Sequence, residues 1–315
     1  MKKRMSLLLV IAMSLAMLVT GCGSSKSESS EKKTDDKKIT VAASATPHAE
    51  ILEEAKPLLE KEGYTLKIDE FRVGMECGYA PFNWTQSDDS NGGVKVEGND
   101  EYAGGYDVQI AQKIADGLGK KLVIVKTEWD GLVPAVQSGK IDAIIAGMSP
   151  TAERKESIDF TDVYYTSDLV MVVKKGGKYE NATKLSDFKG ATITGQLNTF
   201  HYTVIDQIDG VKKDTAMDNF PAMRVALESG KIDGYVSERP EGVSATSANK
   251  NFAMVEFADG QGFKTSDEDT AIAVGLKKDS DLKDKINKIL AGISEDERKD
   301  LMDQAIKDQP ASEDN

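Results

Sequence analysis

The residues from 141 to 162 combine an apolar run with a polar segment that could bind a carboxylate. The run 141–148 has the character of a buried strand and stops at Ser149. Ser149 is a good helix N-cap, and Pro150 suits the first helical position, where its missing N–H costs nothing. A helix N-terminus offers free backbone N–H groups, and Arg154 adds a guanidinium. An ordinary strand–helix turn with a surface arginine would have the same sequence.

A second copy of this arrangement favours a binding site over an ordinary strand–helix turn. The heptapeptide QSGKIDA at 137–143 precedes the first apolar run, and ESGKIDG at 228–234 precedes another at 232–236. Each heptapeptide follows an amphipathic helical pattern. The second run leads into Glu238, so one copy presents a cation and the other a carboxylate. Ligands of open α/β sheets lie beyond the carboxyl ends of strands, so two such lobes would suit a zwitterion held between them.

Seven ordered motifs now point to a known family. They are GYAPF at 78–82, GGYDV at 104–108, WDGLVP at 129–134, the segment 146–154, IDFT at 158–161, and the segments 237–242 and 269–274. From about residue 71 to 308 the chain resembles the extracellular solute-binding proteins of ABC importers for polar amino acids. Each motif alone is weak, but their order over most of the chain makes the resemblance specific.

The resemblance implies an α/β, two-lobe periplasmic-binding-protein fold with a two-strand hinge that closes around the ligand. We expect lobe one at 71–175, lobe two at 176–264, and a return to lobe one at 265–315. The strand expected at 169–174 leads into a glycine pair at 176–177, which suits the first crossing between lobes. The run 270–276 suits the second.

The N-terminus has the pattern of a lipoprotein signal. Three basic residues precede an apolar run at 5–19 that is short for a spanning helix. The sequence VTGC, ending at Cys22, resembles a lipobox, which implies cleavage before Cys22 and acylation of its thiol. The polar tether that follows favours this interpretation over a plain secretory signal with an incidental cysteine. We therefore expect a signal peptide at 1–21, a lipid anchor and tether at 22–38, and a location on the extracellular face of the cell membrane.

Residues 39–70 have a strand, helix, strand pattern and resemble the N-terminus of methionine-binding lipoproteins. That resemblance ends near Phe71, so the chain carries two candidate first strands, at 64–71 and 72–76. Because Tyr79 follows directly on 72–76, we expect that strand to take the place in the lobe-one sheet. The extension at 39–70 would then be peripheral, as at a chimeric junction.

Composition excludes several other classes of function. Removing the three basic residues of the signal peptide leaves 37 Lys and Arg against 53 Asp and Glu, a net charge of −16, which argues against nucleic acid as a partner. The two cysteines, Cys22 and Cys77, form no disulfide framework if Cys22 is acylated. Two distant histidines without a cysteine cluster argue against structural zinc. We expect a monomer with no metal and no cofactor.

An enzyme on the same fold, such as a periplasmic-type dehydratase, is an alternative. The sequence contains no GxSxG, GxxxxGK[ST] or HExxH motif and no GxGxxG after a strand. Asp159 and Asp162 are paired carboxylates, but their place in a family motif suggests a structural role. A sensory ligand-binding domain is a second alternative. We expect a binding protein and not an enzyme.

The resemblance also implies how the ends of an amino acid are bound. Arg154 matches the arginine that pairs with the α-carboxylate through a planar fork that lysine could not reproduce. Ser149 and the backbone at Gly147 match neighbouring carboxylate donors. Thr199 matches a lobe-two threonine whose N–H reaches the same group. Glu238 matches the acidic residue that receives the α-ammonium, where many relatives have Asp.

The remaining positions of the expected site are the turn before Thr199, the side-chain pocket and an acidic residue. Asn198 stands where the family often has glycine, and asparagine tolerates left-handed backbone. Tyr79 and Trp129 are expected to form the side-chain pocket, with Phe82 and Trp84 as further candidates, although core packing accounts equally well for Phe82.

Glu76 matches an acidic position that faces the ligand's distal group in binders of basic amino acids. An anionic end with aromatic walls suits Lys or Arg, through charge pairing and cation–π contact. A solvated Glu76 or a neutral ligand stays open. The expected partners are thus an amino acid, with Lys or Arg favoured, and an ABC transporter permease.

Overall fold

The computed structural model describes residues 37–41 and 50–310. The chain divides into two units, residues 1–37 and 38–315, and both lobes lie within the second. The predictions for the signal peptide and for acylation of Cys22 lie outside the described residues. Within the described part of the chain, no helix combines the length and apolar character needed to cross a bilayer.

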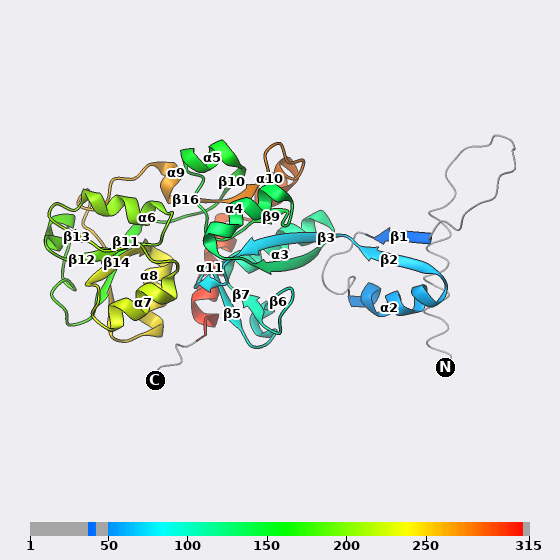
Figure 1. The fold of residues 1–315 in the computed structure, drawn as a ribbon, viewed down its shortest axis with the longest axis horizontal. Helices are drawn as coiled ribbons and strands as arrows, with labels where there is room; N and C mark the ends of the chain where they lie inside the picture. The colour runs from blue at the N-terminus through cyan, green and yellow to red at the C-terminus, as the bar shows by residue number, and fades with distance from the viewer. Residues whose placement is uncertain (1–36, 42–49, 311–315) are drawn as a thin grey trace, which may run out of the picture. The chain divides into compact units, whose positions relative to one another are not determined.

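Lobe one is built on a five-stranded sheet in the order β10-β16-β9-β3-β8 (Figure 1). Its strands are β3 (Glu70–Met75), β8 (Lys121–Lys126), β9 (Ala143–Ile144), β10 (Asp159–Thr166) and β16 (Ala271–Leu276). β3 runs parallel to β8 and β9, and β16 runs antiparallel to β9 and β10. Beside it, a four-stranded sheet contains β4 (Gly78–Tyr79), β5 (Asn83–Gln86), β6 (Val94–Lys95) and β7 (Tyr102–Gly104).

Lobe two is built on a second five-stranded sheet in the order β13-β12-β14-β11-β15. Its strands are β11 (Leu169–Lys174), β12 (Thr192–Thr194), β13 (Lys212–Lys213), β14 (Gly234–Glu238) and β15 (Phe252–Val255). β12 runs parallel to β13 and β14, whereas β11 is antiparallel to β14 and β15. The carboxyl ends of β12 and β14 therefore lie at the same edge of the sheet.

The helices bury the apolar faces that the sequence pattern indicates. Lobe one has α3 (Tyr106–Leu118), α4 (Trp129–Ser138), α5 (Ala152–Ser157), α10 (Lys283–Leu290) and α11 (Glu295–Asp308). Lobe two has α6 (Phe200–Thr203), α7 (Phe220–Glu228) and α8 (Arg239–Ala248), with 3₁₀ turns at Leu185–Phe188 and Val204–Gln207; a further 3₁₀ turn, Ser90–Gly92, lies in lobe one. On α7, Met223 and Leu227 are fully buried, while Val225 on the opposite face is 69% exposed. This is the amphipathic pattern predicted for α7.

The first crossing between the lobes lies before β11, which corrects the boundary predicted at residue 176. β11 pairs with β14 and β15, so its residues belong to the lobe-two sheet. The link from β10 to β11 consists of Ser167 and Asp168. Gly176, with φ +70°, lies in the turn after β11. An apolar run does not reveal which sheet it joins, so the glycine pair alone suggested a crossing eight residues too late.

The two crossings form the two-strand hinge that the fold prediction includes. The chain returns to lobe one between β15 and β16, through a segment that contains the short helix α9 (Asp267–Thr270). Ser167 N donates to Thr270 O at 3.0 Å, which joins one crossing to the other. Arg239 N donates to Asp168 O at 2.9 Å and fixes the short link to the start of α8.

The N-terminal extension forms a small sheet of its own. β1 (Lys37–Val41) pairs with β2 (Tyr64–Ile68), and α2 (Glu50–Lys61) packs against β2. β3, and not β2, lies between β9 and β8 in the lobe-one sheet. The strand predicted at 64–71 is therefore split, and its last two residues belong to β3.

Candidate functional site

Six of the ten residues assigned to ligand binding line one cavity between the two lobes, and Glu76, Phe82, Asn198 and Glu238 do not line it. A small cavity is lined by Tyr79, Trp129, Gly147, Ser149 and Arg154 from lobe one and by Gln196, Thr199, Phe200 and His201 from lobe two. Its volume is about 10 Å³, roughly the space that one water molecule needs. Side chains of the two lobes touch across it, so the lobes are closed on each other.

The turn before Arg154 differs from its prediction. α5 begins at Ala152, and Thr151 is its N-cap, because Thr151 Oγ1 accepts a hydrogen bond from Arg154 N at 3.4 Å. Ser149, the predicted cap, instead donates its hydroxyl to Asp269 O at 2.9 Å. The run before it is buried except for the half-buried Asp142, but only Ala143–Ile144 pair as strand β9. Ser149 and Arg154 still line the cavity together.

Gly147 fits its place only because it lacks a side chain. Its φ is +61°, and a Cβ there would lie 2.7 Å from Cε1 of Tyr79. Glycine adopts this backbone without strain. The Tyr79 ring can therefore lie directly against the main chain that precedes Ser149.

Arg154 reaches across the cavity without an acidic partner among the described residues. One guanidinium nitrogen donates to Ser149 O at 3.0 Å, and another donates to Asn198 O of lobe two at 3.1 Å. The guanidinium also lies over the Trp129 ring, 4.9 Å from its centroid. Burial lowers the pKa of Arg154 to about 10, so it remains a cation at neutral pH. A partly buried cation held only by carbonyl oxygens is suited to an incoming carboxylate.

Glu238 of lobe two is only 2% exposed. The Tyr79 hydroxyl donates to Glu238 Oε2 across the cavity. Nε2 of His201 lies 3.0 Å from Glu238 Oε1, a contact that would be an ion pair only if the imidazole were protonated, and neither ring nitrogen of His201 has a hydrogen-bond partner among the described residues. Burial raises the pKa of Glu238 to about 8. Burial, assisted by the charge of Arg154, lowers the pKa of His201 to about 3.

Glu76 makes a second contact between the lobes. Gln196 Nε2 donates to Glu76 Oε1 at 3.0 Å and to Asp218 O at 3.1 Å. Burial raises the pKa of Glu76 to about 7, opposed by the Gln196 hydrogen bond and reinforced by the charges of Glu128 and Asp130. The Glu76 carboxyl group is thus buried and contacts an amide. This is the arrangement expected of a group at the end of a side-chain pocket.

Asn198 has the left-handed backbone that its position requires, with φ +56°. Its carbonyl accepts hydrogen bonds from Arg154 and from Trp129 Nε1, the latter at 3.4 Å. Its side-chain amide donates to Asp130 Oδ1 at 2.8 Å. The neighbouring Thr199 lines the cavity at the N-cap position of α6. Asn198 therefore joins lobe two to lobe one at the mouth of the site.

Aromatic rings stack through the closed site. Tyr79 lies between Phe82, with centroids 4.9 Å apart, and Phe220 of lobe two, with centroids 4.3 Å apart. Phe82 is fully buried behind Tyr79 and does not line the cavity. Its surroundings match the core-packing alternative considered for it.

Sequence reasoning missed Gln196, Phe200, His201 and Phe220. Gln196 follows the end of β12, where ligands of open sheets bind, so its position was a usable signal. Phe220 follows the N-cap Asn219 of α7. A single histidine in a short helix that also contains Phe, Tyr and Thr gives no comparable pattern.

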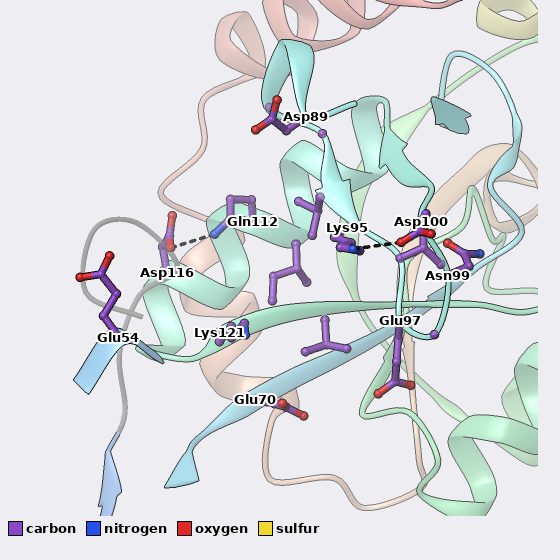
Figure 2. Close-up of a pocket in the computed structure, with 17 residues that line it drawn as sticks. Glu54, Glu70, Asp89, Lys95, Glu97, Asn99, Asp100, Gln112, Asp116 and Lys121 are labelled. Atoms are coloured by element: carbon purple, nitrogen blue, oxygen red, sulfur yellow. Dashed lines mark hydrogen bonds and ion pairs between the residues drawn. The ribbon is translucent and has the colours of Figure 1, made fainter. Parts of the chain in front are cut away.

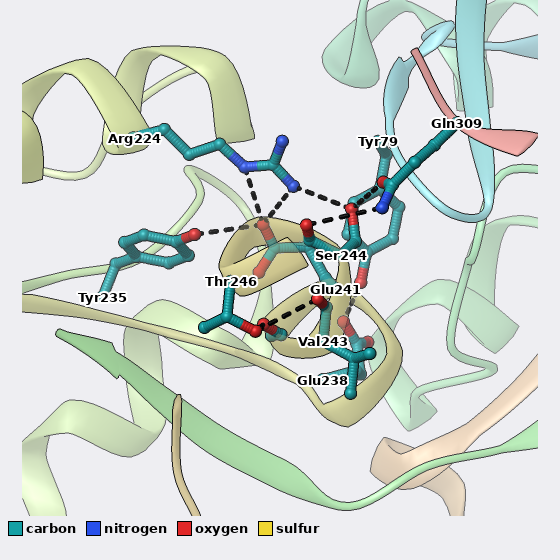
Figure 3. A network of polar contacts seen from close by, with 10 residues as sticks. Tyr79, Arg224, Tyr235, Glu238, Glu241, Val243, Ser244, Thr246 and Gln309 are labelled. Atoms are coloured by element: carbon teal, nitrogen blue, oxygen red, sulfur yellow. Dashed lines mark hydrogen bonds and ion pairs between the residues drawn. The ribbon is translucent and has the colours of Figure 1, made fainter. Parts of the chain in front are cut away.

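A buried polar network holds the helix that Glu238 caps (Figure 3). The Arg224 guanidinium donates to Glu241 Oε1 at 3.0 and 2.8 Å, and the Tyr235 hydroxyl donates to the same oxygen at 3.0 Å. Ser244, one turn on, donates its hydroxyl to Gln309 from the C-terminal segment of lobe one. These contacts fix the first turns of α8 and so position Glu238.

A larger hollow on lobe one has a different character (Figure 2). It has a volume of about 1300 Å³ and is open, with carboxylates at Glu70, Asp89, Glu97, Asp100 and Asp116. Ion pairing such as Lys95 Nζ to Asp100 Oδ1 at 3.4 Å occurs among its exposed residues. An open polar surface encloses no small ligand, so size alone does not make it the functional site. Among the described residues, no group of three or more His, Cys, Asp or Glu side chains could hold a metal ion.

Comparisons with known proteins agree with this geometry. The chain is 34% identical over 184 residues to a probable histidine-binding protein of Campylobacter jejuni, covering 55% of this chain and 65% of that protein. It is 27% identical over 224 residues to the arginine-binding extracellular protein ArtP of Bacillus subtilis, covering 69% and 78%. Among solved structures, an amino acid ABC transporter substrate-binding protein of Streptococcus pneumoniae bound to L-arginine matches with a TM-score of 0.66 and 28% identity, covering 80% of this chain and 98% of that one.

The family comparison covers both lobes and the hinge. Residues 71–307 match the bacterial extracellular solute-binding proteins, family 3. The match begins in β3 and ends in α11, so it contains every residue that lines the interlobe cavity. The chain therefore belongs to the bacterial extracellular solute-binding proteins, family 3.

Proposed function

We propose that this protein binds a free α-amino acid between its lobes and delivers it to the permease of an ABC importer. The observation that carries the proposal is the placement of a cation on lobe one and a buried carboxyl group on lobe two at the contact between the lobes. Arg154 of lobe one lacks an acidic partner among the described residues, and Glu238 of lobe two is buried. Arg154 would take the α-carboxylate, assisted by Ser149, Gly147 and the lobe-two turn at 198–199, and Glu238 would take the α-ammonium.

Binding requires the lobes to open, because the closed cavity of about 10 Å³ cannot contain an amino acid. The contacts that open are those from Tyr79 to Glu238, from Gln196 to Glu76 and from Arg154 to Asn198. A ligand would then replace them with its own charged groups. Rotation at the two-strand hinge supplies such a movement.

A basic amino acid, Lys or Arg, fits the charges of the site best. Once Arg154 and Glu238 pair with the two ends of the ligand, the Glu76 carboxyl remains, with Trp129 and Tyr79 on the cavity wall. A distal cation could pair with that carboxyl and lie against the aromatic rings. The relatives that bind arginine support this choice of class.

The lipoprotein pattern of the N-terminus completes the proposal. Acylation of Cys22 would anchor the protein on the extracellular face of the membrane, and the polar tether at 22–38 would let it reach the permease. The family consists of extracellular solute-binding proteins, so neither a dehydratase nor a sensory domain is needed to account for the site.

Calorimetric titration of the full chain in mild detergent, with each of the twenty amino acids, tests the proposal. Arg154→Ala should weaken binding of the ligand by about 2–5 kcal/mol, because a desolvated carboxylate loses its charged partner. Arg154→Lys should restore only part of the lost affinity, because lysine lacks the planar fork of the guanidinium group.

Arg72→Ala is the matched control. Arg72 pairs with Glu97 at the surface of lobe one, at 2.6 Å, away from the cavity residues. Its loss should leave the dissociation constant unchanged. Equal affinity in Arg154→Ala and the unchanged protein would overturn the proposed orientation.

A further inference from the structure

His201 has unmet hydrogen-bonding capacity inside the interlobe cavity. Its side chain lines the cavity from α6 and is only 5% exposed. Neither Nδ1 nor Nε2 has a hydrogen-bond partner among the described residues. Buried polar side-chain atoms in native proteins are rarely left without a partner, because their lost hydration is then not replaced. The ring therefore has free nitrogens at the place where a ligand enters.

Apolar neighbours hold the His201 ring but cannot form hydrogen bonds with its nitrogens. The Phe200 ring lies 4.4 Å from the imidazole, centroid to centroid, and Phe220 lies 6.2 Å away, edge to face. Glu238 Oε1 is near Nε2, at 3.0 Å, yet the two atoms make no hydrogen bond. The packing thus fixes the imidazole beside the carboxyl group while leaving its polar atoms available.

The charged and titratable groups around His201 come from three elements. They are Glu238 at the end of β14, Arg154 on α5 and Tyr79 on β4. Burial and the positive charge of Arg154 both lower the imidazole pKa. A neutral imidazole has one N–H donor and one bare nitrogen that accepts. An ammonium group has three N–H donors, so a single carboxyl group beside it leaves donors to be satisfied.

We propose that neutral His201 contacts the ligand directly and accepts a hydrogen bond from its α-ammonium group, beside Glu238. His201 thereby helps the site select ligands with an α-ammonium over those with an α-hydroxyl. This inference rests on the proposed amino-acid-binding function. The family resemblance assigned no role to His201, and the observation that carries the inference is the pair of unpartnered ring nitrogens.

Two substitutions separate this contact from simple packing. His201→Leu keeps an apolar side chain between the phenylalanines but has no acceptor. His201→Gln keeps an acceptor at about the reach of Nε2. In calorimetry with L-arginine, His201→Leu should weaken binding by about 10- to 100-fold, the range expected for a lost hydrogen bond to a charged group. His201→Gln should stay within a few-fold of the unchanged protein.

The pH profile gives a readout that packing would not alter. In the open lobes an exposed imidazole titrates near its ordinary pKa of about 6.5, whereas the bound form must be neutral. L-arginine affinity should therefore fall as the pH drops below about 6, because a proton must leave before the ligand binds. In His201→Gln the part of the affinity loss at low pH that comes from His201 should disappear. Any part that comes from Glu238 or Glu76 should remain in both the variant and the unchanged protein.

A matched ligand pair completes the test. L-arginine should lose much more affinity in His201→Leu than its α-hydroxy acid analogue, which lacks the ammonium. Equal losses for both ligands, or identical pH profiles for the unchanged protein and His201→Gln, would overturn the inference while leaving amino-acid binding intact. If the unchanged protein binds none of L-arginine, L-lysine, L-histidine and L-glutamine, the inference and the proposed function both fail. Circular dichroism checks the fold, and the glutamine variant decides the question if the leucine variant does not fold.

Discussion

Replacing Glu76 with glutamine tests which class of amino acid the site takes. The change removes one negative charge but keeps the length of the side chain and an oxygen that can accept from Gln196 Nε2, now at 3.0 Å from Glu76 Oε1. A basic ligand would lose its distal charge partner, whereas a neutral ligand would keep a hydrogen-bonding amide. Glu76→Gln therefore affects the two ligand classes differently.

The expected magnitude depends on the burial of this carboxyl. Glu76 is 9% exposed, and losing one partner of a buried charge pair costs about 2–5 kcal/mol, or about 30-fold to several thousand-fold in affinity. The closed lobes hold the pKa of Glu76 at about 7, so a proton competes with the ligand cation. That competition grows as the pH falls below 7 and fades as the pH rises above it.

Titration with L-arginine and L-glutamine at pH 6, 7 and 8 measures both effects. Glu76→Gln should weaken L-arginine binding and reduce its dependence on pH over this range, and should leave L-glutamine binding nearly unchanged. Glu101→Gln, which changes an exposed carboxylate paired with Lys126 at 3.0 Å, is the control. If Glu76→Gln binds L-arginine as tightly as the unchanged protein does, the preference for basic ligands is wrong and only the clamp on the α-amino and α-carboxyl groups remains.

Two further predictions concern the N-terminal part of the chain. Deleting residues 39–68, which stops before β3, should leave ligand affinity close to that of the full chain, because β3 supplies the strand that leads to Glu76 and Tyr79; titration of the deletion protein checks this, and loss of folding or of binding would show that the extension supports lobe one. Cys22→Ser should abolish labelling by radioactive palmitate and release the protein from membranes or leave its signal peptide uncleaved; an unchanged protein that takes up no label would contradict the lipid anchor.

Local pattern predicted most of the helices and the central strand. The apolar spacing in α3, α4 and α7 was sufficient because each helix buries one face. The choice of 72–76 over 64–71 for the lobe-one sheet rested on its direct continuation into Tyr79, and β3 occupies that place. The family motifs then brought Arg154, Tyr79 and Thr199 to one cavity.

The remaining features depend on contacts between residues distant in sequence. Both Ser149 and Thr151 could cap α5, and Thr151 does so while Ser149 bonds to Asp269, which lies 120 positions away. The sheet that β11 joins is likewise decided by β14 and β15, not by its own residues. His201 stood out only once α6 was folded against Glu238, because a lone histidine carries no spacing from which to infer a role.

The two-residue link at Ser167 and Asp168 has a consequence for how fast the two half-sites meet. β10 continues into β11 through these two link residues, and each of them is held by a backbone hydrogen bond. Arg154 and Glu238 therefore stay at a high effective concentration with respect to each other. A ligand captured by either lobe then meets the second half of its site within the same molecule. Because the link has few backbone torsions, the lobes can rotate but can hardly slide past each other. Each closure therefore brings the same charged groups together, whatever the protein concentration.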